Sequence, residues 1–297
     1  MITLENEHLT VKINTFGAEI ASVIDRQTSY EFMWQADPEF WARQAPVLFP
    51  IVGRLKDNQF KYEEHLYEMT QHGFARDSVF EVVESTEQTA LFKLTSSDET
   101  KKVYPFDFEL YIQYKLSQKS VVTKYKVVNT ADADAMYYAI GGHPAFNVSQ
   151  KMTEEGELEF DQVSFQIQPE TPVRYFPLSE GGLIKNQEMQ EVSFGEVEVT
   201  HDTFEDDALV FEMGESKTIV LKDKANHVEI RMQTANLPYL GIWSPYPKRG
   251  SFVCIEPWAG IADAEDTDGE FVDKIGINML APLEEKVHEY HTTFIKE

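Results

Sequence analysis

The chain has 297 residues, of which 42% are hydrophobic and 12% aromatic, and this composition is typical of a globular protein with a large core. Its 26 basic and 51 acidic side chains give a formal net charge of −25, which disfavours nucleic acid and anionic membranes as partners through electrostatic repulsion and suits a neutral ligand. No low-complexity or Gly/Ser-rich linker divides the chain, so we expect one domain over residues 1–297.

The N-terminal residues, MITLENEHLTVKIN, contain no basic segment followed by an apolar run. No later stretch approaches the roughly 18 apolar residues of a membrane-spanning helix. Cys254 is the only cysteine, so an internal disulfide cannot form. These features predict a cytoplasmic protein, which we expect to be a monomer or a homodimer.

Hydrophobic periodicity favours β-strands along most of the chain. In chain order, a short helical stretch is expected at residues 37–45 (DPEFWARQA), followed by β-hairpins at residues 80–97 with the turn STEQT and at residues 106–129 with the turn SQKS. A third hairpin is expected at residues 217–235 with the turn DKAN, and a second short helical stretch at residues 263–273. The sequence therefore predicts an all-β fold, a large antiparallel sandwich with a site on its concave sheet.

Sequence motifs exclude several kinds of active site. The chain has no GxGxxG, GxxxxGK[ST], GxSxG or CxxC motif, so a nucleotide-binding loop, a nucleophile elbow and a thiol redox pair have no support. The remaining candidates are polar side chains that neighbouring Gly, Pro or aromatic residues could hold at the mouth of a cleft. They are Arg54 in FPIVGRLKDNQF, His72 and Arg76 in QHGFARDSVF, His143 in GGHPAFN, and Glu256 in FVCIEPWAG.

Glu256 is the hardest of these candidates to explain as a purely structural residue. An apolar run precedes it, so a strand there would carry its carboxylate into a partly buried place, where it needs a partner or a role. His143 taken alone could equally be a turn histidine with satisfied hydrogen bonds. Cys254 is expected to be a buried, inert thiol, and Trp243 and Trp258 could belong to the core or form a platform for a ligand.

The candidate segments, taken in order, resemble the aldose 1-epimerase family, also called galactose mutarotases, and most closely its LacX-like branch. The resemblance rests on Gly53-Arg54, His72-Gly73, the stretch GGHPAFN, the stretch IEPW, and the opening ITLENEHLTVKINTFGAEIASV. It extends from about residue 1 to the end of the chain. It implies the family's fold, a large galactose mutarotase-like β-supersandwich, which agrees with the hairpin pattern.

The resemblance also implies roles for individual residues. His143 corresponds to the family's catalytic acid, Glu256 to its catalytic base, and Arg54 and His72 to residues that contact the sugar. Interconversion of α and β anomers requires the base to remove the proton of the C1 hydroxyl while the acid protonates the ring oxygen. A nearby carboxylate favours the charged form of histidine, so we expect an ionised Glu256 and a protonated His143. This reaction requires no metal ion or redox cofactor.

Further substrate contacts follow from the same resemblance. The stretch EDDALVF resembles the place of the family's substrate-binding aspartate and implies Asp207, although Asp206 is adjacent and the family's Asp-His pair is Asp-Ala here. An aromatic face could cover the C–H surface of the sugar, and Trp243, Trp258 and Phe146 are candidates for it.

The leading hypothesis is an epimerase that acts on a free aldohexose such as galactose or glucose. One alternative is a relative that acts on hexose 6-phosphates, in which Arg54, Lys56 or Arg76 would bind the phosphate. Another is a carbohydrate-binding protein without turnover.

Two further alternatives belong to other classes of enzyme. His72, His143 and Glu256 could form a metal site of two histidines and one carboxylate, although the chain has no cupin-like HxH cluster. A glycosidase would need a second catalytic acid, and no spacing in the sequence singles one out.

Overall fold

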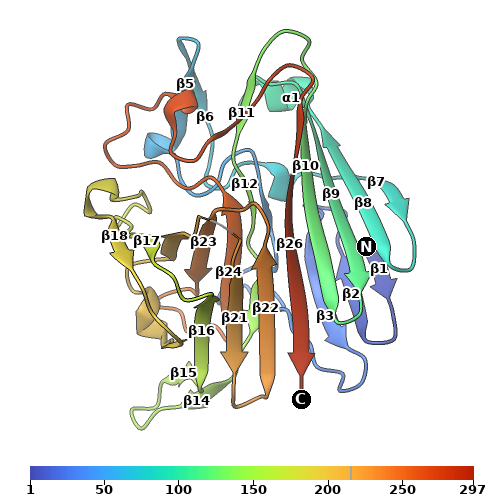
Figure 1. Cartoon of the computed structure of the whole chain (residues 1–297), viewed down its shortest axis with the longest axis vertical. Helices are drawn as coiled ribbons and strands as arrows, with labels where there is room; N and C mark the ends of the chain where they lie inside the picture. The colour runs from blue at the N-terminus through green and yellow to red at the C-terminus, as the bar shows by residue number, and fades with distance from the viewer. Residues whose placement is uncertain (215) are drawn as a thin grey trace.

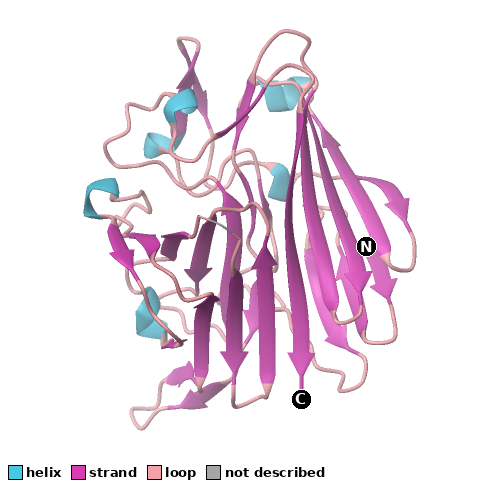
Figure 2. Ribbon diagram, in the orientation of Figure 1, coloured by secondary structure: helices cyan, strands magenta, loops and turns pink. Residues whose placement is uncertain are grey.

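The computed structural model describes residues 1–214 and 216–297, and most of the described chain consists of antiparallel β-strands (Figure 1, Figure 2). The predicted all-β, antiparallel fold is confirmed. The larger sheet has nine strands, in the order β19 (Val197–Glu198), β16 (Val163–Gln168), β21 (Thr218–Asp223), β22 (Val228–Thr234), β26 (Glu285–Lys296), β10 (Ser120–Asn129), β9 (Phe108–Ser117), β8 (Thr89–Thr95) and β7 (Glu81–Ser85).

A second sheet has eight strands, and a third, at the N-terminus, has three. The second follows the order β18 (Gln190–Val192), β17 (Val173–Phe176), β20 (Leu209–Glu212), β23 (Tyr239–Trp243), β24 (Phe252–Ala259), β12 (Ile140–Gly142) and β4 (Val47–Leu48), and β13 (Ala145–Asn147) also pairs with β24. The third consists of β1 (Ile2–Glu5), β2 (Leu9–Ile13) and β3 (Ile20–Asp25).

Small hairpins and single helical turns complete the described chain. The two-stranded units are β5 (Gln59–Tyr62) with β6 (His65–Glu68), β11 (Met136–Tyr138) with β25 (Asn278–Leu280), and β14 (Gln150–Met152) with β15 (Leu158–Phe160). The helical elements are α1 (Asp98–Lys101) and the 3-10 turns η1 (Lys56–Asn58), η2 (Ala75–Asp77), η3 (Asn186–Glu188), η4 (His201–Phe204) and η5 (Phe271–Asp273). None of the helices in the described residues has the length and apolar character needed to cross a lipid bilayer.

The three predicted hairpins are confirmed as β7–β8, β9–β10 and β21–β22. In β10 every second residue is buried from end to end, which is the alternation that the sequence shows. Figure 1 shows β8, β9, β10 and β26 running side by side, so the long hairpins form the middle and one edge of the nine-stranded sheet.

The two predicted helical stretches are shorter than expected. Residues 38–40 form a turn, and only Phe271–Asp273 is helical within residues 263–273. In both stretches, backbone N–H groups bond to distant parts of the chain, as Ala45 does to the Glu19 carboxylate (2.6 Å) and Asp263 to the Arg54 carbonyl (2.8 Å). A helix would require these N–H groups for its own bonds, so tertiary contacts override the local helical preference.

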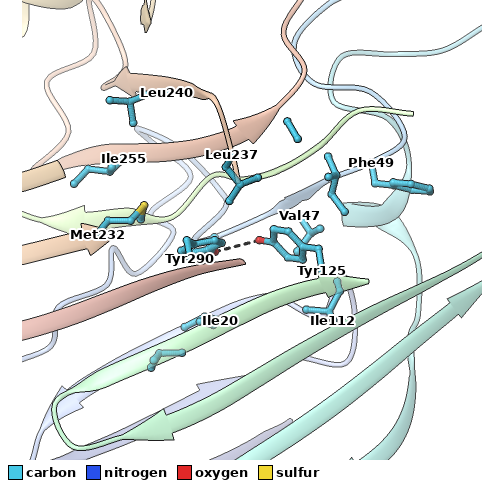
Figure 3. Close-up of a cluster of buried hydrophobic side chains, with 14 of the residues drawn as sticks. Ile20, Val47, Phe49, Ile112, Tyr125, Met232, Leu237, Leu240, Ile255 and Tyr290 are labelled. Carbon is cyan, nitrogen blue, oxygen red and sulfur yellow. Dashed lines mark hydrogen bonds between the residues drawn. The ribbon is translucent and has the colours of Figure 1, made fainter. Parts of the chain in front are cut away.

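The main core lies between the nine-stranded sheet and the other two sheets. Figure 3 shows side chains from β9, β10, β22 and β26 meeting side chains from β3, β4, β23 and β24. The Tyr125 and Tyr290 hydroxyls form a hydrogen bond (3.1 Å) at its centre, so neither buried phenol is left unpaired. One hydrophobic cluster contains residues from Leu4 to Phe294. This continuous core supports our proposal that residues 1–297 form one domain.

Strand β24 is buried over all eight of its residues. Val253 and Ile255 belong to the main core, whereas Cys254 and Trp258 belong to other clusters. Side chains alternate between the two faces of a strand, so Glu256 shares a face with Cys254 and Trp258. This face borders the cavity that holds the candidate site.

Buried histidines make the stability of this fold dependent on pH. His288 of β26 is fully buried, and its Nδ1 faces the Asn236 carbonyl (3.4 Å), so Nε2 accepts the hydrogen bond of the Tyr138 hydroxyl (2.8 Å). Burial lowers the pKa of His288 to about 4. Between this value and the ordinary value near 6.5 the unfolded chain binds more protons than the folded chain, so stability falls as pH falls through this window.

We expect the protonation of His288 alone to lower the free energy of unfolding by about 3 kcal/mol as the pH falls through this window. Urea unfolding at pH 7 and pH 4.5 checks it, with a His288→Gln variant as the comparison. The variant should lose less stability than the wild type between the two pH values. Equal losses in the two proteins would contradict the assignment of this histidine.

Candidate active site

The register of the second sheet brings His143 and Glu256 together. β12 and β13 both pair antiparallel with β24, and the two ladders share one register. In the first ladder Gly141 lies opposite Trp258, and continuing this register by two residues places His143 opposite Glu256. Directly opposite residues of antiparallel strands project their side chains from the same face of the sheet, so the two groups meet.

The sequence around His143 interrupts this ladder. Pro144 has no N–H group to donate, and the His143 N–H donates to the Pro46 carbonyl (3.1 Å). Gly142 is required by a close approach, since a Cβ atom there would lie 2.8 Å from the Tyr290 hydroxyl. Glycine and proline thus separate β12 from β13 and leave the imidazole at the edge of the cavity.

His143 and Glu256 form a buried and incompletely bonded pair. Nε2 of His143 lies 3.2 Å from Oε2 of Glu256, and the residues are 7% and 1% exposed. Neither Oε2 nor the Nδ1 atom of His143 makes a hydrogen bond with the described residues, so the short contact lacks hydrogen-bond geometry. The pair therefore has free donor and acceptor capacity for a ligand.

Burial decides the protonation of this pair. Desolvation lowers the pKa of His143 to about 3, and desolvation, assisted by the charge of Asp207, raises the pKa of Glu256 well above its usual range. The expectation of an ionised Glu256 beside a charged His143 is therefore wrong for the free site. Attraction between two charges does not offset their desolvation here because no well-aligned hydrogen bond joins them. Both shifts favour the neutral forms, a protonated Glu256 carboxyl group beside a neutral His143 imidazole.

His72 lies beside this pair, with its ring centroid 5.6 Å from that of His143. Nδ1 of His72 accepts a hydrogen bond from the Gly53 N–H (3.1 Å), which leaves the Nε2–H of the neutral ring as a donor. Burial, followed by the effect of His143, lowers the pKa of His72 well below its usual value. Gly73, with φ 68°, passes so close to Phe49 that a Cβ atom would lie 2.3 Å from its carbonyl oxygen.

These residues line a cavity of about 260 Å³. Strands β20, β23 and β24 of the second sheet contribute to it together with neighbouring loops, and its lining contains the six main candidates for catalysis and sugar binding. These are Arg54, His72, His143, Asp207, Trp243 and Glu256.

Arg54 and Asp207 lie at the same part of the cavity wall, on either side of Gly182. A Cβ atom on Gly182 would lie 3.3 Å from Cδ of Arg54 and 3.5 Å from Oδ2 of Asp207. Asp207 has φ 74° and borders the cavity, whereas Asp206 is absent from its lining. The structure thus distinguishes between the two adjacent aspartates.

The three basic residues considered for phosphate binding differ in position. Arg54 and Arg76 line the cavity. Arg76 donates to the Gln71 carbonyl (2.7 Å), and its buried Nε makes no hydrogen bond with the described residues but lies 3.7 Å from Oδ2 of Asp77. Lys56 instead donates to the Glu265 carbonyl (2.7 Å), away from the cavity, so its proposed phosphate role is wrong.

Two of the three aromatic candidates border the cavity. Trp243 and Trp258 line it, whereas Phe146 lies in the main core and cannot cover a ligand there. Trp258 fits between strands because Gly141 and Gly241 flank it, and a Cβ atom on either glycine would lie within 2.4 Å of its ring. The indole Nε1 of Trp258 is buried and has no partner among the described residues, so it is a free donor.

Sequence reasoning missed Trp41. Its ring stacks on His143 with centroids 4.9 Å apart and planes at 26°, and Trp243 meets the same imidazole edge-on at 5.5 Å. The carbonyl of Trp41 accepts the indole N–H of Trp34 (2.8 Å), which fixes the loop. The stretch DPEFWARQA carried a signal, two aromatic residues beside a proline, but its pattern favoured a helical turn.

The residues that could bind a metal ion together are not the set suggested by the sequence, which was His72, His143 and Glu256. In the described chain, ligand atoms of His143, Cys254 and Glu256 lie within 4.8 Å of one another. His72, which the sequence suggested as a possible ligand, is not part of this group. Cys254 is buried as expected, and burial raises the pKa of its thiol well above the usual value.

Comparison with known proteins places this chain in a family. The family model for aldose 1-epimerase matches residues 1–271, and the chain belongs to the aldose 1-epimerase family. It is 31% identical over 304 aligned positions to the plasmid-encoded and the chromosomal LacX proteins of Lactococcus lactis subsp. lactis, with 99% of each chain covered.

Solved structures agree with this assignment. A galactose mutarotase related enzyme from Lactobacillus acidophilus is 39% identical, with a TM-score of 0.92 over 99% of this chain and 97% of that one. A galactose mutarotase-like protein from Lactobacillus casei ATCC 334 is 29% identical, with a TM-score of 0.93 over 99% of this chain and 100% of that one. The predicted galactose mutarotase-like supersandwich is confirmed.

Proposed function

We propose that the protein is an aldose 1-epimerase that interconverts the α and β anomers of a free aldohexose such as galactose or glucose. The observation that carries this proposal is the His143–Glu256 pair, whose Nε2 and Oε2 atoms lie 3.2 Å apart at a cavity lined with further hydrogen-bonding groups. Opening a hemiacetal needs one group to take a proton and another to give one, and this pair supplies both.

Substrate binding prepares the pair for this reaction. Burial favours the neutral pair in the free site, whereas the reaction starts from an ionised Glu256 and a protonated His143. A C1 hydroxyl that donates to the Glu256 carboxylate stabilises its ionised form, and a ring oxygen that accepts from His143 stabilises the imidazolium. Glu256 then removes the C1 hydroxyl proton while His143 protonates the ring oxygen, and closure on the other face of the aldehyde reverses both steps.

The remaining cavity residues orient the sugar. His72 donates through Nε2–H, Arg54 donates through its guanidinium, and Asp207 accepts from hydroxyl groups. Trp243 and Trp258 offer apolar surface to the C–H groups of the ring. These residues supply no proton in the reaction, so we propose substrate-binding roles for them.

Optical rotation of freshly dissolved α-D-galactose and α-D-glucose tests the proposal. The protein should accelerate the approach of at least one sugar to its equilibrium rotation in proportion to protein concentration. Saturable binding of these sugars without acceleration would contradict the enzyme and support a carbohydrate-binding protein. No acceleration of any free or phosphorylated aldohexose would end the proposal.

A second candidate substrate is a hexose 6-phosphate, because two arginines border the cavity of this acidic protein. Arg54 and Arg76 are both in the lining, and the buried Nε of Arg76 makes no hydrogen bond with the described residues, with the Asp77 carboxylate 3.7 Å away. An Arg76→Gln variant should then lose kcat/KM on glucose 6-phosphate about tenfold or more and change little on glucose. Lys56→Gln, outside the cavity, is the matched control. Equal losses on both sugars would assign Arg76 to the fold rather than to phosphate.

A further inference from the structure

His143, Cys254 and Glu256 form a compact group of three different donor types. Their ligand atoms lie within 4.8 Å of one another, and all three residues are buried. Cys254 and Glu256 are two residues apart on β24 and project from one face, while His143 lies opposite Glu256 in the register of the sheet. The site is therefore built on strands, which hold side chains in fixed directions.

Free coordination capacity lies within this group. Oε2 of Glu256 has no hydrogen-bond partner among the described residues, although this residue is only 1% exposed, and Nε2 of His143 faces this oxygen. Four-coordinate zinc bonds of 2.0–2.3 Å place neighbouring ligand atoms about 3.5 Å apart. The His143–Glu256 contact of 3.2 Å is already close to this separation. The Cys254 sulfur lies within 4.8 Å of the other two ligand atoms, so a small side-chain movement would bring it to bonding distance of the same ion.

Charge balance favours a divalent cation over a monovalent or trivalent one. The Cys254 thiol loses one proton on binding the metal, and the Glu256 carboxyl group loses another. A dication bound by one thiolate, one carboxylate and a neutral imidazole gives a site with no net charge, which suits a buried place. Sulfur and nitrogen donors select a thiophilic ion such as Zn²⁺ over Mg²⁺.

We propose that His143, Cys254 and Glu256 bind a thiophilic divalent cation such as Zn²⁺ and that this cation inhibits the enzyme. The ion enters from the cavity, where His143 and Glu256 are part of the lining, and takes Cys254 as its inner ligand. It then occupies the ring nitrogen and the carboxylate that carry protons in the reaction. The inhibition rests on the proposed function, whereas the binding does not.

Direct metal binding is the first test, and it needs no activity. Zn²⁺ added to the full chain should bind at one equivalent by equilibrium dialysis, and Co²⁺ should give a thiolate-to-cobalt absorption band. Cys254→Ala should abolish that band and weaken Zn²⁺ binding at least about tenfold, which equals 1.4 kcal/mol. Cys254→Ser, which keeps the volume of the side chain, is the second variant if the alanine protein folds poorly. An unchanged Zn²⁺ affinity in both variants would overturn the proposal.

Inhibition is the second test. Micromolar Zn²⁺ should slow anomer interconversion by the wild type and have much less effect on Cys254→Ala, while millimolar Mg²⁺ should have none. His291→Gln is the matched control, because His291 and Glu289 form a surface pair that could also bind zinc. Equal inhibition of the wild type and Cys254→Ala, relieved in His291→Gln, would place the inhibitory ion on the surface. If the protein has no epimerase activity, the cobalt band still decides the metal site.

Discussion

Replacing Glu256 by Gln is expected to slow anomer interconversion by about 10²- to 10⁴-fold, the range that one positioned proton acceptor contributes. The amide keeps the size of the side chain and cannot take the C1 hydroxyl proton. The carboxyl group in the wild type is buried and has a raised pKa, so a neutral amide costs no ion pair in the free protein. We therefore expect the urea midpoint of this variant to match or exceed that of the wild type.

His143→Asn should cause a loss of similar size, because the ring oxygen then has no proton donor. The double variant should be little slower than either single variant, since His143 and Glu256 act as one unit. Polarimetry over a range of protein concentrations measures all three rates.

Cys254→Ala is the matched control for these rates. This residue lies next to Glu256 on the same face of β24 but outside the cavity lining, and we expect a rate within about threefold of the wild type. A Glu256→Gln variant that is folded and retains most of its activity would contradict the proton-transfer role. Losses that multiply in the double variant would show that the two residues act separately.

Replacing Lys274 by Met is expected to destabilise the protein by about 3–5 kcal/mol, the cost of leaving a buried charge unpaired. The Lys274 ammonium donates to Oδ1 of Asp263 (2.7 Å), and the two side chains are 2% and 5% exposed. Burial lowers the pKa of Lys274, and the charge of Asp263 opposes this shift. Solvent cannot stabilise either charge once its partner is removed, because both side chains are buried.

The same aspartate also organises the backbone behind Arg54. Oδ2 of Asp263 accepts the Lys56 N–H (2.9 Å), and the Asp263 N–H donates to the Arg54 carbonyl (2.8 Å). An Asp263→Asn substitution preserves an acceptor for Lys56 and removes the charge. The pair Asp263→Asn with Lys274→Met should therefore recover part of the stability lost in Lys274→Met alone.

Urea unfolding at pH 7 measures these differences. A loss below about 1 kcal/mol in Lys274→Met would mean that the site admits water and that the charge is not buried in solution. A double variant less stable than Lys274→Met would contradict the electrostatic explanation, because the unpaired charge is then not the source of the loss.

Much of the sheet architecture could be predicted from the sequence. The hairpins of residues 106–129 and 217–235 follow from alternation around polar turns, which is regular in β10 and β22. The hairpin of residues 80–97 was predicted in the same way, although β7 is exposed along its whole length. The helical stretches at residues 37–45 and 263–273 could not be placed, because the bonds that replace their helical bonds come from residues far away in the chain.

The chemical types of the candidate site were also present in the sequence. Glu256 in an apolar strand and His143 between glycine and proline were singled out by their neighbours, and both line the cavity. The sequence around Trp41 favoured only a helical turn, because the contact of Trp41 with His143 depends on how this loop folds over the sheet. The sequence could not show that Arg76 lines the cavity while Lys56 does not, because these positions depend on the path of the chain in three dimensions.

The sequence by itself determined the strand pattern, the family and the residue types available for acid–base chemistry, because alternation and short motifs are local properties. Only the tertiary structure decided that His143 lies opposite Glu256, since this depends on the register in which β12 and β13 pair with β24. It also decided that this pair is buried, which favours its neutral forms. Protonation depends on how much solvent surrounds the pair, and burial is set by packing from every side of the site.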